Sequence, residues 1–123
     1  MAKILVVDDD PSVVEVLKHA LSRAKYSVCV AYNGKEGLEA ARLEKPDLII
    51  LDIMMPEIDG ITASGILFQD PVLRRTPVLI LTAKASARHM LELLPNVRLY
   101  LTKPFDPPEL LKSVQRLLSA PPS

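Results

Sequence analysis

The sequence predicts an α/β fold, a doubly wound parallel sheet of five strands with helices on both faces. Short, continuous apolar runs recur along the chain, and such runs are typical of strands buried on both faces. Segments with apolar residues at helical spacing lie between these runs, so strands and helices alternate. The chain has 123 residues, 49% of them hydrophobic, which suits one domain with a buried core.

The first half of the chain contains three predicted strands and two predicted helices. Asp10 before Pro11 predicts an N-cap followed by proline at the first helical position. Asn33 and Gly34 turn the chain into a second helix, which Pro46 ends because proline cannot continue a helix. These signals predict strands over residues 3–8, 27–31 and 48–52. They also predict a helix over 11–24 and a second helix that begins at 34 and is closed by the segment 44–47.

The second half of the chain predicts two more strands and three more helices. The helix over 60–69 is a poor one, because Gly65 costs roughly 1 kcal/mol relative to alanine. The strand Val97–Leu101 alternates more than the others, so we expect it at an edge of the sheet. The remaining elements are a strand over 77–82, a weak helix over 83–94 and a last helix that starts at 106–109. Residues 1–119 then form the domain, and 120–123 form a tail or the start of a linker.

The order of the strands follows from the way in which alternating strands and helices connect. Helices on both faces and right-handed crossovers allow few orders, and the flavodoxin-like order 2-1-3-4-5 is the expected one for five units. In open sheets of this kind, ligands bind at the carboxyl ends of the strands. The polar residues at those ends are therefore the candidates for a functional site.

Composition excludes several classes of protein. The longest apolar runs are far shorter than a membrane span, and no signal peptide is expected, because the first residues lead directly into a predicted strand. Cys29 is the only cysteine, so an internal disulfide is excluded and a reducing, cytoplasmic location is expected. Lys and Arg number 15, as do Asp and Glu, and the resulting net charge of zero argues against nucleic-acid binding by this domain.

Each strand that matters to the site ends in a lone polar residue, and in the expected order these ends lie at one edge. The residues are Asp8 and Asp9 after the first strand, Asp52 at the third, Thr82 at the fourth and Lys103 after the fifth. Neighbouring strands lie about 4.8 Å apart, so three carboxylates, a hydroxyl and an ammonium converge. Repulsion among the carboxylates favours Mg²⁺, which prefers carboxylates, waters and phosphate oxygens. The set predicts phosphoryl transfer in which a carboxylate becomes an aspartyl-phosphate.

Most of the polar residues have an ordinary structural interpretation when each is taken alone. An aspartate at a strand end is usually a cap or turn residue, and we interpret Asp10 as a cap and Asp59 as a turn residue. Tyr100 alone is explained by a core position with a solvated hydroxyl. His19 and His89 have no second ligand at metal-binding spacing and are interpreted as solvated helix positions. The joint arrival of five polar residues at one edge is what favours a functional site.

Over essentially its whole length the chain resembles a response-regulator receiver domain, as found in two-component signal transduction. The matching segments are Ile4–Pro11, Pro46–Pro56, Asp59-Gly60, Pro77–Lys84 and Tyr100–Phe105. Their order and spacing together are highly specific. The resemblance implies a phosphorylation-dependent switch that is a regulatory domain rather than an enzyme, since it would catalyse only its own phosphorylation and dephosphorylation.

The resemblance also implies a role for each matching residue. Asp52 is the phosphoacceptor, and Lys103 contacts the phosphoryl group and is joined to Pro104 by a cis peptide bond. Thr82 is the switch hydroxyl, and Tyr100 is the aromatic residue that changes rotamer with it. Mg²⁺ is the implied cofactor, and its implied ligands are Asp8, Asp9, Asp52 and the backbone carbonyl of Met54.

The partners implied by the resemblance are a histidine kinase or phosphotransfer protein, as in a phosphorelay, and an effector domain or downstream protein. A homodimer through the face of the fourth helix, fifth strand and last helix is a further expectation, whereas nucleic acid and membrane are not expected to bind this domain itself. The segment 87–99 lacks the Gly-Ala pair of many receivers, and residues 65–68 are apolar where a charged surface is common. Both departures concern surfaces that contact other proteins.

Two other readings compete with the switch. A haloacid-dehalogenase-type phosphatase also uses an aspartate at a strand end, but it needs a second aspartate two residues later as a general acid. Met54 occupies that position and cannot transfer a proton. The second alternative is a receiver-like docking module that is not phosphorylated. Such variants usually lose an acid or the lysine, and this chain keeps all of them.

Overall fold

Five parallel strands form one sheet at the centre of the computed structural model, which describes residues 2–53, 55, 58–83 and 95–119. The strands are β1 (Lys3–Val7), β2 (Ser27–Ala31), β3 (Leu48–Asp52), β4 (Val78–Thr82) and β5 (Val97–Thr102), in the order β2-β1-β3-β4-β5. The described helices are α1 (Pro11–Arg23), α2 (Gly34–Glu44), α3 (Gly60–Gln69) and α5 (Pro107–Ser119). The predicted fold class and strand order are confirmed.

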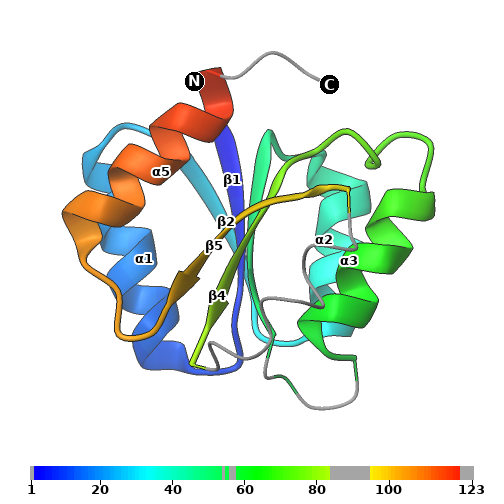
Figure 1. Ribbon diagram of the computed structural model, residues 1–123, viewed down its shortest axis with the longest axis horizontal. Helices are drawn as coiled ribbons and strands as arrows, with labels where there is room; N and C mark the ends of the chain where they lie inside the picture. Colours follow the sequence, from blue (N-terminus) through cyan, green and yellow to red (C-terminus); the bar gives the residue numbers. More distant parts are fainter. Residues whose placement is uncertain (1, 54, 56–57, 84–94, 120–123) are drawn as a thin grey trace.

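The helices cover the two faces of the sheet in pairs. Figure 1 shows α1 and α5 on one side and α2 and α3 on the other, with the carboxyl ends of the strands at the bottom of the view. Because strand side chains point alternately to the two faces, each strand contributes to two cores. In β1, Ile4 and Val6 pack with α1 and α5, whereas Leu5 and Val7 pack with α2 and α3.

Burial of the strands follows their place in the sheet. Every residue of β3 and β4 is buried, as expected for central strands covered on both faces. No residue of β5 is fully buried, which confirms that this strand lies at an edge. Three predicted strand bounds are off by one residue: β1 ends at Val7, β4 starts at Val78 and β5 continues to Thr102.

Side-chain caps fix the starts of the first three helices. The Asp10 carboxylate accepts a hydrogen bond from the Ser12 backbone N–H, which confirms its predicted role as N-cap. Asn33 accepts from the Glu36 N–H at 2.8 Å. Asp59, which the sequence indicated only as a turn residue, is the N-cap of α3 and accepts from the Thr62 N–H.

Two predicted segments fall outside the described residues. These are residues 84–94, which make up most of the weak helix predicted over 83–94, and the predicted tail 120–123. Among the helices that the structure describes, none is both long enough and apolar enough to cross a membrane.

Replacing Ile50 by alanine tests the importance of the central strand. Ile50 is 1% exposed in β3, so Ile50→Ala should lower the free energy of unfolding by about 2–5 kcal/mol through lost burial and a cavity. Urea denaturation measures the change. Leu43→Ala is the control, because Leu43 is 79% exposed and its loss should change stability by no more than about 0.5 kcal/mol. Equal losses in both variants would contradict this assignment of the core.

Candidate functional site

Three carboxylates meet at the carboxyl edge of the sheet. The parallel register aligns Val7 of β1 with Leu51 of β3, so the next residue on each strand, Asp8 and Asp52, lie side by side. Both are buried, at 1% and 3% exposed, whereas Asp9 is exposed. One carboxylate oxygen from each of the three lies within 4.8 Å of the others. The site therefore has two buried acids and one that faces solvent.

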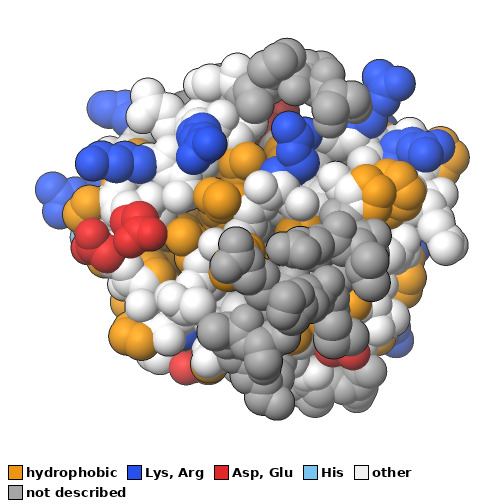
Figure 2. Space-filling view, viewed as in Figure 1, with side chains coloured by type: hydrophobic (Ala, Val, Ile, Leu, Met, Phe, Trp, Pro, Cys, Tyr) orange, Lys and Arg blue, Asp and Glu red, His pale blue; other side chains and the backbone are white. Residues whose placement is uncertain are grey.

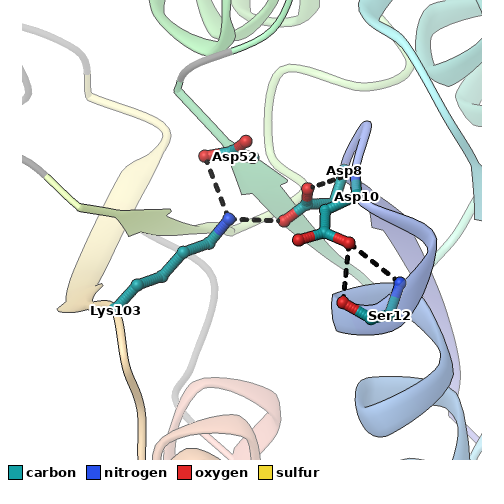
Figure 3. Close-up of polar contacts among 5 residues, drawn as sticks. All are labelled: Asp8, Asp10, Ser12, Asp52 and Lys103. Carbon is teal, nitrogen blue, oxygen red and sulfur yellow. Dashed lines mark hydrogen bonds and ion pairs between the residues drawn. The ribbon is translucent and has the colours of Figure 1, made fainter.

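Lys103 reaches the carboxylates from the far side of β4. Its Nζ atom lies 2.8 Å from Asp8 Oδ2 and 3.5 Å from Asp52 Oδ1, and Figure 3 shows the ammonium between the two acids. The Lys103 backbone N–H donates to the Thr82 carbonyl at 2.8 Å, which ties the start of this loop to the end of β4. The peptide bond from Lys103 to Pro104 is cis.

The charge of Lys103 is set by opposing effects. Partial burial lowers the pKa of its ammonium, but the hydrogen bond to Asp8 and the nearby negative charges of Asp52 and Asp8 together outweigh burial and leave the pKa above its usual value. The side chain is therefore a full cation at neutral pH. It partly neutralises the pair of buried carboxylates.

Asp10 points away from this cluster. Figure 3 shows its carboxylate turned toward Ser12, where it accepts from the hydroxyl at 2.7 Å and from the backbone N–H at 2.9 Å. These hydrogen bonds lower the pKa of Asp10. The Asp10 backbone N–H in turn donates to Asp8 Oδ1 at 2.9 Å. Both oxygens of Asp8 are thus engaged, one by Lys103 and one by the backbone of Asp10.

The two predicted switch residues lie on β4 and β5. Thr82 is 1% exposed at the end of β4, and its register partner on β5 is the exposed Thr102. Tyr100 is two residues earlier on β5, half-buried against the core that faces α2 and α3. Met54, predicted to supply a backbone carbonyl, lies outside the described residues.

A groove of about 500 Å³ runs beside β5 toward α5. Its lining combines apolar and polar side chains: Leu99, Tyr100, Leu101, Thr102, Pro104, Phe105, Asp106 and Glu109. Figure 2 shows this face of the molecule, where apolar side chains are exposed below a rim of Lys and Arg and beside acidic side chains. Tyr100 therefore belongs both to the core and to an accessible surface.

The sequence placed Gly34 in a turn and Gly60 in a matching Asp-Gly pair, but it did not indicate the close contacts that both glycines make near the site. A Cβ atom on Gly60 would overlap the backbone carbonyl of Asp52, and a Cβ atom on Gly34 would lie 2.5 Å from the Ile58 carbonyl oxygen. Both contacts bring helix starts against the segment that follows the third strand. The available signals were an Asn-Gly pair shortly after the second strand and an Asp-Gly pair in the segment that follows the third strand.

The donor set fits a hard divalent cation. Carboxylate oxygens are the ligands that Mg²⁺ prefers, and Mg²⁺ usually keeps several waters and binds through one or two carboxylates plus phosphate oxygens. The exposed position of Asp9 leaves one side of the cluster accessible to water. The residues present therefore match a Mg²⁺-dependent phosphoryl-transfer site.

Comparison with known proteins identifies the family. A family model described as the response regulator receiver domain matches residues 4–115. The chain belongs to this family. It is a receiver domain of the two-component type, and such domains signal in a phosphorylation-dependent way.

Individual relatives agree with this family. The chain is 44% identical over 117 residues to the alkaline phosphatase synthesis transcriptional regulatory protein PhoP of Bacillus subtilis, with 94% of this chain and 48% of that protein covered. The receiver domain thus spans about half the length of that regulator. A putative response regulator of Chloroflexus aurantiacus, solved as a crystal structure, is 36% identical with a TM-score of 0.91, covering 97% of this chain and 98% of that one.

A third relative bears on the metal site. The receiver domain of a sensor histidine kinase from Pseudomonas aeruginosa PAO1 was solved with a magnesium ion coordinated in its active-site cleft. It is 28% identical to this receiver domain, with a TM-score of 0.89 and coverage of 97% and 98% of the two chains.

Removing the Lys103 ammonium should destabilise the metal-free receiver domain. Lys103→Met leaves the buried Asp8 and Asp52 without their cation, at an expected cost of about 3–5 kcal/mol in the free energy of unfolding. Chemical denaturation in the presence of EDTA measures this loss, and Mg²⁺ should restore much of it. Lys35→Met, at an exposed lysine of α2, is the control. A Lys103→Met protein as stable in EDTA as the control would refute this electrostatic role.

Proposed function

We propose that this receiver domain accepts a phosphoryl group on Asp52 from a phosphohistidine of a histidine kinase or phosphotransfer protein. The observation that supports this most directly is the Lys103 ammonium, which lies between Asp8 and Asp52 at a buried sheet edge. Lysine and Mg²⁺ neutralise charge on the equatorial oxygens in such transfers. A site with this polarity stabilises a phosphoryl group that arrives at a carboxylate.

The contact with Lys103 differs between the two buried acids. Asp8 has one oxygen held at 2.8 Å by Lys103 and the other held at 2.9 Å by the Asp10 backbone. Asp52 Oδ1 lies farther from the ammonium, at 3.5 Å, so less of its electron density is committed to that contact. The looser contact of Asp52 with Lys103 favours Asp52 as the group that attacks phosphorus, with Asp8 and Asp9 beside it as further ligands for Mg²⁺.

The transfer exchanges one bond to phosphorus for another. An Asp52 carboxylate oxygen forms the new P–O bond as the P–N bond of the phosphohistidine breaks, and the electron pair of that bond returns to the imidazole nitrogen. Asp8, Asp9 and Asp52 would hold Mg²⁺, which would supply positive charge for the phosphoryl oxygens. Lys103 must exchange its contact with Asp8 for one with the phosphoryl group. The receiver domain thereby catalyses its own phosphorylation.

The surface beside the site suits a docking donor. A hollow of about 450 Å³ adjoins Lys103 and is lined by Ser12, Val13, Val16, Lys103, Pro104 and Phe105. Val16, which is 48% exposed, adds an accessible apolar side chain to this lining. A phosphohistidine can reach the buried Asp52 only if its protein contacts the rim of the site. We assign this hollow to the donor.

The output of the switch involves Thr82, Tyr100 and the groove beside β5. A phosphoryl group adds close to two negative charges and three acceptor oxygens, and a hydroxyl on the neighbouring strand can donate to it by moving inward. The movement changes the space next to Tyr100, which is both a core residue and part of the groove lining. An effector domain, a downstream protein or a second copy of the chain that binds this groove would sense the change.

Intact mass after incubation with Mg²⁺ and acetyl phosphate tests the phosphoacceptor. We expect a gain of one phosphoryl group that EDTA abolishes, because the metal offsets the charge of the incoming group. Asp52→Asn should show no gain. Asp10→Asn is the matched control, since Asp10 is a helix cap outside the cluster, and it should still be phosphorylated. A folded, Mg²⁺-binding wild-type protein without any mass gain would favour the docking module instead.

Thr82→Ala separates phosphorylation from the switch. The variant should still gain a phosphoryl group, but it loses a charge-assisted hydrogen bond of about 1.5–3 kcal/mol, so the equilibrium constant between the activated and inactive states should fall by roughly tenfold or more. NMR shifts of the Tyr100 region upon phosphorylation report that population. Thr102→Ala, at the exposed register partner of Thr82, should respond like the wild type. Undiminished shifts in Thr82→Ala would remove this hydroxyl from the mechanism.

A further inference from the structure

A small pocket lies at the amino edge of the sheet, opposite the edge that carries Asp52. It has a volume of about 80 Å³ and lies between the loop after α3 and the start of β5, and Figure 1 shows that loop at the top of the view. Three arginines line the pocket, Arg74, Arg75 and Arg98, together with Phe68, Asn96 and two prolines. None of these described lining residues is acidic, so positive charge gathers in a hollow outside the proposed phosphorylation site.

The loop that carries two of these arginines is held by its own hydrogen bonds. The Leu73 and Arg74 backbone N–H groups donate to the Asp70 carbonyl at 3.2 and 2.9 Å. The Thr76 N–H donates to the Leu73 carbonyl at 3.0 Å. Leu73 is 2% exposed, so the middle of the loop is anchored in the core. Arg74 and Arg75 therefore extend from a fixed backbone, which reduces the freedom that ligand binding has to remove.

Asn96 fixes the opposite wall of the pocket. Its side-chain amide donates to the Ser64 carbonyl of α3 at 2.9 Å, and the residue is only 4% exposed. Its backbone carbonyl accepts from the Val78 N–H at the start of β4, also at 2.9 Å. The start of β5 is thus tied both to a helix and to the neighbouring strand. Both walls of the pocket are formed before any ligand arrives.

The third arginine occupies an irregularity of β5. The register passes from Val97 opposite Val78 to Leu99 opposite the very next residue of β4, so Arg98 is the extra residue at this point. Bulges of this kind redirect a side chain and are frequent beside functional sites. The departure from regular pairing brings a cationic side chain to the wall of the pocket.

The charges of Arg74 and Arg75 are available to a ligand. Within the described part of the chain neither guanidinium makes an ion pair. The Asp70 carboxylate at the start of the loop contacts Arg42 instead and accepts from backbone N–H groups of its own loop. The Arg74 guanidinium lies 5.2 Å from the centroid of the Phe68 ring, a cation–π contact that orients it. Arginine stays protonated at every physiological pH, so this positive charge is permanent.

From this arrangement we propose that the pocket binds a phosphate group, either free inorganic phosphate or the end of a small phosphomonoester. Arginine pairs with phosphate through parallel N–H···O hydrogen bonds, and a phosphate group carries close to two negative charges where a carboxylate carries one. A volume of about 80 Å³ suits a small oxyanion, whereas drug-sized ligands occupy roughly 300 Å³ or more. The inference is independent of the proposed function, because no residue of this pocket belongs to the phosphorylation site.

Calorimetric titration with inorganic phosphate tests the site, at constant ionic strength and in EDTA so that no Mg²⁺ holds phosphate at Asp52. The wild type should bind phosphate saturably. Arg74→Gln and Arg75→Gln change exposed residues and should each weaken binding by roughly tenfold, the effect of losing a charge-assisted contact. Arg116→Gln, at an exposed arginine of α5 outside the pocket, is the matched control and should bind like the wild type. No saturable binding, or equal weakening in Arg116→Gln, would overturn the inference.

NMR spectra recorded during the same titration locate the bound anion. The amide resonances of Arg75 and Asn96 should move with phosphate concentration, while those of Asp8 and Asp52 stay nearly constant. Shifts confined to Asp8 and Asp52 would place the anion at the other edge of the sheet and would refute this site.

Parallel titrations with acetate and with glycerol 3-phosphate define the ligand. Acetate should bind at least roughly tenfold more weakly than phosphate, because it brings less charge to the arginines. Acetate binding as tight as phosphate binding would contradict the assignment to a phosphate group. Tighter binding of glycerol 3-phosphate than of inorganic phosphate would identify a phosphomonoester as the ligand, and weaker binding would identify free phosphate.

Discussion

Two carboxylates buried side by side need a cation, and the carboxyl edge of the sheet is arranged around that need. Asp8 and Asp52 are adjacent because β1 and β3 pair in register, and both are almost inaccessible to solvent. Burying like charges without a partner is strongly unfavourable. Lys103 supplies the positive charge across β4, and its backbone is bonded to the end of that strand. The geometry of three strands is therefore coupled to a single ammonium.

The fold was largely predictable because the relevant signals are local or periodic. Apolar runs identified the strands, and the cap at Asp10 placed the start of α1 to the residue. The strand order followed from general rules of chain connection. Bounds were off by one residue where polar residues continue a strand or end it early, as at Asp8 and Thr102, because hydrogen bonding rather than hydrophobicity decides those ends.

The site was predictable in its members but not in its contacts. Strand ends brought Asp8, Asp9 and Asp52 together as expected. The sequence could not indicate that Lys103 lies closer to Asp8 than to Asp52, because that difference depends on the conformations of side chains at the ends of different strands. Nor could it reveal that Ile58 approaches Gly34. The two residues are 24 positions apart in the sequence, and the glycine is the only sign of their contact there.

The alternation of β1 between two cores has a consequence for how such a domain can diversify. Ile4 and Val6 pack against α1 and α5, and Leu5 and Val7 pack against α2 and α3. The two layers therefore share the backbone of β1 but few side chains. Substitutions in one layer can accumulate with little demand on the other. The layer that carries the apolar hollow near Lys103 can therefore change its packing and surface while the residues at the strand ends stay the same.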